Sequence, residues 1–199
     1  MVASPPGSRP EPFAGLDLVD WAAFRPRNPR DAERDACEIP DLIRGLAAAD
    51  GQTTREWGEA LKEALVHGHS GLYFRTAEPT APFLIELCRS ERPEVAAESL
   101  RLLLSCVGDD GPFDPVPLRP DDTHLSEFVT RTRAIIHSGR AAYHPWLHSS
   151  HLGARIGALE LLGVLEPRSP QFQRELARLA ASDGNLRIQQ AIREIQADL

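Results

Sequence analysis

The sequence predicts an all-α protein, an α-solenoid of about four helical pairs with no sheet. Leu and Ala number 25 each among the 199 residues, whereas aromatic residues make up 6%. This balance favours helices packed through aliphatic side chains. Apolar residues recur with the period of a helix, and an outline of helix, tight turn and helix returns along the chain. Neither helix of such a pair can bury its apolar stripe alone, so the pairs must stack into one core.

The periodic segments give the expected elements in order. A first helix is expected over 40–49, where Pro40 stands at a helix start and its missing N–H costs little. The only candidate strand, over 72–76, is short. The further helices are expected over 53–66, 76–89, 93–107, 123–137, 143–149 (a short one), 152–165, 170–181 and 185–197.

Composition divides the chain into four parts. Residues 1–13 lie in a proline-rich stretch and are predicted to be a disordered tail. Residues 14–108 hold an N-terminal cap, the amphipathic island 16–24, followed by helical repeats. Residues 109–122 contain four prolines and five aspartates and are expected to form a long loop. Residues 123–199 hold the C-terminal repeats, which continue the same solenoid.

The sequence indicates a cytoplasmic protein without membrane contact. The N-terminus lacks the basic and apolar regions of a secretory signal. The densest apolar run, 100–107, is interrupted by Arg101 and Ser105 and is far shorter than the ~20 residues that span a bilayer. The three cysteines form no C-x-x-C pair, and Cys88 and Cys106 lie in apolar helical patterns, which fits reduced thiols.

The repeats share a spacing. Leu147 precedes Arg155 by eight residues, Leu179 precedes Arg187 by eight, and the two arginines are 32 residues apart. These repeats resemble the HEAT-repeat family, and more narrowly the short HEAT-like proteins of GC-rich bacteria. The segments that carry the resemblance are Asp-Trp-Ala-Ala at 20–23, Ile-Pro-Asp-Leu-Ile-Arg-Gly-Leu at 39–46, Thr-Ala-Pro-Phe-Leu-Ile-Glu-Leu at 80–87 and Ala-Arg-Ile-Gly-Ala-Leu-Glu-Leu-Leu-Gly at 154–163.

The resemblance covers 14–197 and departs at 109–122. It implies an α-solenoid of HEAT-like pairs that serves as a protein-binding scaffold rather than an enzyme. Some bacterial members look like immunity proteins that neutralise a cognate toxin, and others are fused to enzymes or regulators. The alternatives are an enzyme of the HEAT-like DNA glycosylase type, which needs a basic groove, and a regulatory subunit of a modification complex.

The second helix of each pair is expected to line the concave, partner-binding face. The net charge of −7 argues against nucleic acid and suits a basic toxin domain encoded nearby, because opposite charge speeds capture. The candidate contact residues are Glu56, Glu59, Glu63, Glu98, Arg101, Glu160, Gln189 and Arg193, with Tyr73 and Trp146 as anchors.

Two patterns admit a structural and a functional interpretation. Asp50 and Asp183 precede second helices whose first turns hold Arg55 and Arg187, which suggests either an anion-binding ladder or helix caps and braces; the caps are favoured. The loop 67–75 either packs or binds, and both interpretations stay open.

A histidine cluster also has two interpretations. His144, His148 and His151 have a spacing that could place them on one helix face, but Pro145 interrupts that helix and no fourth ligand lies close in sequence. His67 and His69 form a weaker pair. No metal site is therefore predicted, and no catalytic or cofactor motif is found.

Overall fold

The computed structural model describes residues 13–24, 34–66, 74–107 and 123–197, and the regular structure within these ranges is helical, as predicted. Short 3-10 helices occupy Leu16–Leu18, Trp21–Phe24, Ala36–Glu38 and His144–His148 (η5). The α-helices are α1 (Ile39–Ala48), α2 (Gly51–Leu65), α3 (Ala77–Leu87), α4 (Pro93–Ser105), α5 (Thr123–Ser138), α6 (Arg140–Tyr143), α7 (Leu152–Leu165), α8 (Pro170–Ser182) and α9 (Leu186–Ala197).

The expected helix boundaries differ from the observed ones by a few residues at most, apart from the short helix. The segment expected as one helix over 143–149 is divided into α6 and η5, because Pro145 has no N–H to continue the α-helical ladder. The expected strand is not formed by the residues of it that are described; Phe74 N donates a single hydrogen bond to Leu65 O at 2.7 Å. Most of the predicted tail and the loop 109–122 lie outside the described residues.

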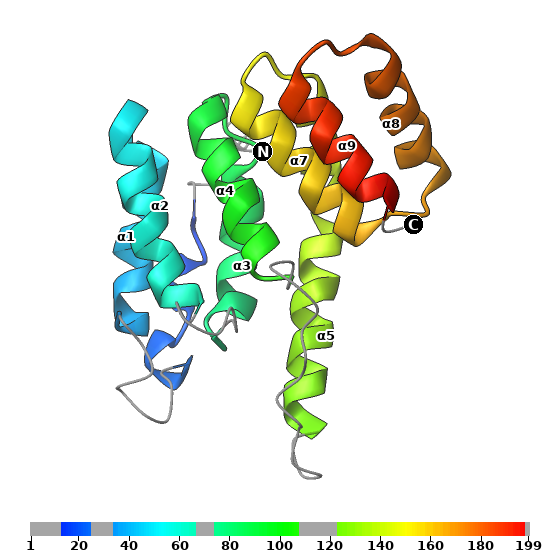
Figure 1. The fold of residues 1–199 in the computed structure, drawn as a ribbon. Helices are drawn as coiled ribbons and strands as arrows, with labels where there is room; N and C mark the ends of the chain where they lie inside the picture. Colours follow the sequence, from blue (N-terminus) through cyan, green and yellow to red (C-terminus); the bar gives the residue numbers. More distant parts are fainter. Residues whose placement is uncertain (1–12, 25–33, 67–73, 108–122, 198–199) are drawn as a thin grey trace, which may run out of the picture.

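Four helices lie side by side in one row. α2 contacts α4, α4 contacts α7, and α7 contacts α9. Figure 1 shows the four helices in this order, with the N-terminal ends of all four along the same edge of the row. The helix that precedes each one packs against it: α1 on α2, α3 on α4, η5 on α7, and α8 on α9. α5 packs against α3 and leads through α6 into η5.

Small residues allow α4 and α7 to approach closely at the centre of the row. A Cβ placed on Gly157 would lie 3.0 Å from Leu100 Cβ, and one placed on Gly153 would lie 3.6 Å from Ala97 Cβ. At Gly157 a side chain would press on Leu100, whereas a Cβ on Gly153 would make an ordinary contact with Ala97. Gly157 therefore allows the close approach of α4 and α7.

The N-terminal island docks on α1 and α3. Leu16 and Trp21 are buried in the same core as the helices, and the Trp21 indole donates to Leu16 O at 3.0 Å. The Trp21 ring lies 6.4 Å from that of Phe83, and Asp17 accepts from Arg44 on α1. The island thus covers the end of the first helical pairs. Among the described helices, none combines the length and the apolar character that crossing a membrane requires.

Candidate functional site

A cleft of about 290 Å³ crosses the row near the N-terminal ends of its four helices. Its walls include Thr54 and Arg55 from α2, Glu98 from α4, Ile156 from α7 and Arg187 from α9. A second hollow of about 150 Å³, between α7 and α9, shares Ile156 and Arg187 with it. The cleft therefore takes side chains from all four helices of the row.

An ion network forms one wall of the cleft. Arg101 bridges two acids: its Nη2 lies 3.3 Å from Glu59 Oε1 and also pairs with Glu98, one turn earlier on α4. Burial opposes the charge of Arg101, but its hydrogen bond to Glu98 and the charges of both acids raise its pKa above the ordinary value. Glu98 lies directly over Gly58, whose missing side chain makes room for the carboxylate. The network thereby joins α2 to α4.

The start of α2 forms the rim of the cleft. Asp50 is its N-cap residue, and the N-cap N–H donates to Thr53 Oγ1 at 3.0 Å. The Thr53 hydroxyl donates in turn to the Asp50 carbonyl at 2.7 Å. Asp50 therefore stands at the N-cap position that the favoured interpretation gives it, in a capping box with Thr53.

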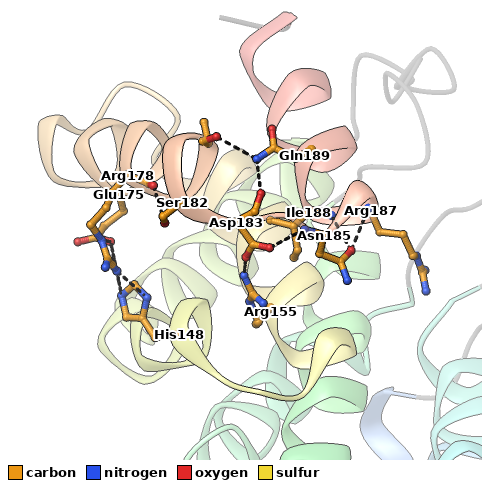
Figure 2. Close-up of polar contacts among 11 residues, drawn as sticks. His148, Arg155, Glu175, Arg178, Ser182, Asp183, Asn185, Arg187, Ile188 and Gln189 are labelled. Carbon is orange, nitrogen blue, oxygen red and sulfur yellow. Dashed lines mark hydrogen bonds and ion pairs between the residues drawn. The ribbon is translucent and has the colours of Figure 1, made fainter.

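The predicted cap at Asp183 is wrong in its detail. Asn185 caps α9, because its Oδ1 accepts from the backbone N–H groups of Arg187 and Ile188 at 3.0 and 3.4 Å. Asp183 instead accepts from Asn185 N at 2.9 Å and forms an ion pair with Arg155 of α7. Figure 2 shows this cluster, in which Asp183 ties the α8–α9 turn to the neighbouring helix pair.

Each of the three histidines contacts a different partner. His144 Nε2 is 2.7 Å from Glu166 Oε1, and His148 Nε2 is 3.4 Å from Glu175 Oε2. His151 is the N-cap of α7, with its Nδ1 accepting from a backbone N–H at 3.2 Å. In the part of the chain that the structure describes, no three His, Cys, Asp or Glu side chains are placed to hold a metal ion together.

We expect metal removal to leave the fold unchanged. Each of the three histidines is oriented by a protein partner, so no folding energy should depend on a bound ion. Dialysis against a chelator should therefore leave the melting temperature where it was, as measured by circular dichroism. A fall of several degrees that zinc restores would contradict this expectation.

Three of the ten predicted contact residues line the cleft: Glu98, Arg101 and Glu160. Two others are held in ion pairs, Glu59 with Arg101 and Glu63 with Arg34 at 2.8 Å. Their charge is already partly neutralised within the protein, so reversing it would break internal contacts as well as change the surface.

The remaining five predicted contacts lie in different settings. Glu56 and Arg193 are exposed on α2 and α9. Gln189 holds the α8–α9 turn, since its amide donates to backbone carbonyls at 2.8 and 3.0 Å. Tyr73 lies outside the described residues.

Trp146, expected as a binding anchor, makes contacts within the fold. Its indole Nε1 donates to Cys88 O at 2.7 Å, across the junction between η5 and the end of α3, and its ring packs against the core. The ring is therefore committed within the fold.

Replacing Trp146 by Phe should lower the free energy of unfolding by about 1–2 kcal/mol, because the Cys88 carbonyl loses its donor while most of the ring contact is kept. Urea unfolding followed by far-UV circular dichroism measures this change. Unchanged stability together with weakened partner binding would restore the anchor interpretation.

Some residues of the cleft were not predicted as contacts. Arg55 and Arg187 were interpreted as braces, and Thr54 was not singled out at all. The sequence carries a local signal for the two arginines, because acids are usual at the start of a helix. Arg187 lies in the first turn of α9, and Arg55 lies just beyond the first turn of α2.

The buried cysteines are not suited to nucleophilic chemistry. Burial raises the pKa of Cys106 to about 12, and burial also raises the pKa of Cys88. Both side chains are therefore neutral thiols at physiological pH, and a thiolate is the reactive species. They pack as small apolar groups, as the sequence indicated.

No family model, no curated protein and no solved structure matches this chain. What the protein binds must be inferred from its own residues.

Proposed function

We propose that this protein is a non-enzymatic scaffold, an α-solenoid of about four HEAT-like helical pairs that holds a partner protein along the row of α2, α4, α7 and α9. The observation that carries the proposal is the single cleft to which all four helices contribute side chains. A surface built from consecutive second helices is the kind of extended face on which solenoids bind other proteins.

The layout of the cleft supports a polypeptide as its occupant. α4 and α7 present matching stripes at i, i+3, i+4 and i+7. Each stripe combines small or apolar residues with at least one charged residue, so the cleft offers a polypeptide both apolar contacts and polar partners. A hollow of about 290 Å³ suits side chains inserted from a partner surface. The stripe residues are Glu94, Ala97, Glu98 and Arg101 on α4, and Gly153, Ile156, Gly157 and Glu160 on α7.

The proposal includes inhibition of a basic toxin domain encoded nearby, for which the support is the net charge of −7. Opposite net charge accelerates the encounter of two proteins.

Affinity purification with a filled cleft tests the scaffold function. Arg55 and Glu94 are exposed and border the cleft, so Arg55→Trp with Glu94→Trp fills it without entering the core. The matched control is Gln171→Trp with Arg174→Trp, at exposed positions of α8 that do not line the cleft. From cells of the source organism, the wild type and the control should recover the same partner protein, and the filled variant should lose it.

Equal recovery of the partner by the filled variant would contradict the proposed face. Recovery of no partner by the wild type would contradict a stable scaffold. If the partner is recovered but is not a basic, toxic protein, the scaffold function stands and the inhibitor function falls.

A further inference from the structure

Three of the four helices that border the cleft begin with an uncommon charge. The N-terminal end of a helix carries a partial positive charge, so acidic side chains are favoured there. α2, α7 and α9 have no acid in the first turn. Instead, each has an arginine within its first five residues: Arg55, Arg155 and Arg187. Cations at these positions are unfavourable unless an anion accompanies them.

Arg155 shows how the chain itself compensates such a cation. Its side chain, 18% exposed, pairs with the carboxylate of Asp183, which is 10% exposed. The ion pairs among described residues include neither Arg55 nor Arg187. Figure 2 shows Arg187 extending away from the Asp183 cluster, with no dashed line ending on its guanidinium. Both exposed arginines line the cleft.

A buried hydroxyl in the same cleft also lacks a partner. Thr54 lines the cleft and is 3% exposed, and its Oγ1 has no hydrogen-bond partner among the described residues. Three other buried hydroxyls, those of Thr80, Ser99 and Thr132, donate to the carbonyl four residues back, as Thr80 does to Thr76 O at 2.6 Å. At Thr54 that carbonyl belongs to Asp50, which already accepts from the N–H and the hydroxyl of Thr53 at 3.0 and 2.7 Å. An unpaired buried donor is costly and calls for an acceptor.

We propose that the cleft binds an acidic segment of its partner protein, whose Asp and Glu carboxylates accept from Arg55, Arg187 and the Thr54 hydroxyl. This inference rests on the proposed function, because it names the chemistry of the segment that the scaffold holds. Two of the cleft acids are already engaged within the protein: Glu98 pairs with Arg101 on its own helix, and Glu94 lies in the first turn of α4, where it offsets the helix end. The net negative charge of the protein then attracts a partner at long range, whereas Arg55 and Arg187 bind its acidic segment at contact.

Fluorescence polarisation with a labelled Ala-Glu-Ala-Glu-Ala-Glu peptide tests the inference on the full chain. The Glu peptide should bind at least about tenfold more tightly than its Gln counterpart, since charge-assisted hydrogen bonds are the stronger ones. Arg55→Gln with Arg187→Gln should weaken binding by about tenfold or more. Arg174→Gln, at an exposed arginine of α8 outside the cleft lining, is the matched control and should leave peptide binding unchanged.

Thr54→Val separates a ligand contact from a structural one. The substitution removes the unpaired hydroxyl and keeps the shape, so it should raise the melting temperature of the free protein. It should also weaken binding of the Glu peptide several-fold. A higher melting temperature with unchanged peptide affinity would remove Thr54 from the proposed contact.

Equal binding of the Gln peptide, or preference for a Lys peptide, would overturn the inference. Preference for a labelled single-stranded oligonucleotide over the Glu peptide would also overturn it, and would indicate a phosphate site. Suppose that the Glu peptide fails to bind while the filled variant still recovers no partner in affinity purification. In that case the scaffold function stands, and the acidic character assigned to the bound segment is wrong. If the Glu peptide binds and no partner is ever recovered, the proposed function fails by itself.

Discussion

Replacing Asp183 by Ala should lower the free energy of unfolding by about 3 kcal/mol, one of the two largest effects that we expect. Asp183 is the carboxylate that faces Arg155, and both side chains are largely buried, at 10% and 18% exposed. Its loss leaves the Arg155 guanidinium inside the protein without a counter-charge, and Arg155 Nε already lacks a hydrogen-bond partner among the described residues. Asp183 also holds Asn185 N, so the α8–α9 turn loses a second contact.

The double variant Arg155→Met with Asp183→Ala is the control for this prediction. It removes both charges together, and a buried ion pair replaced by apolar groups is often close to neutral. Urea denaturation should therefore show the double variant recovering most of the lost stability. A double variant as unstable as Asp183→Ala alone would mean that the turn contact, rather than the uncompensated charge, causes the loss.

Replacing Gly157 by Leu should also lower the free energy of unfolding by about 3 kcal/mol, by separating α4 from α7. A Cβ at this position would lie 3.0 Å from Leu100 Cβ, closer than side chains normally pack, so Leu100 or the helix that carries it must shift. The two helices form the most extensive helix–helix contact in the described chain, so they cannot part without disturbing the core on both sides.

The control for Gly157 is a glycine in open surroundings. A Cβ on Gly184 meets nothing within 4 Å, and Gly184→Leu should change stability by no more than about 0.5 kcal/mol. The two variants add the same side chain, so urea unfolding compares their settings directly. Equal and small losses at both positions would show that α4 and α7 adjust freely, against the close packing described above.

The helices themselves followed from local sequence. The α7 segment is expected over 152–165 and is found over Leu152–Leu165, because its apolar period and the caps around it are contained within the segment. Pro93 and Pro170 likewise mark the starts of α4 and α8. Where the ends of an element are determined by nearby residues, the sequence is sufficient.

The contacts of single side chains could not be predicted from the local sequence in the same way. Trp146 could be expected as an anchor, since its acceptor is a carbonyl 58 positions away in sequence. Glu59 and Glu63 are predicted as partner contacts, and their ion pairs with Arg101 and Arg34 could not be predicted because these arginines lie in other segments of the chain. Such pairings depend on which helix faces meet, and a single sequence does not specify that.

Site-specific photo-crosslinking tests the central claim, that the cleft is a protein-binding face. A photoreactive amino acid replaces Glu94, which is exposed at the cleft, or Gln171, which is exposed on α8 away from it. After illumination of living cells of the source organism, Glu94 should give one discrete, higher-mass product that contains a second protein, and Gln171 should give none. Products of equal yield from both positions, or a product from Gln171 alone, would contradict the claim.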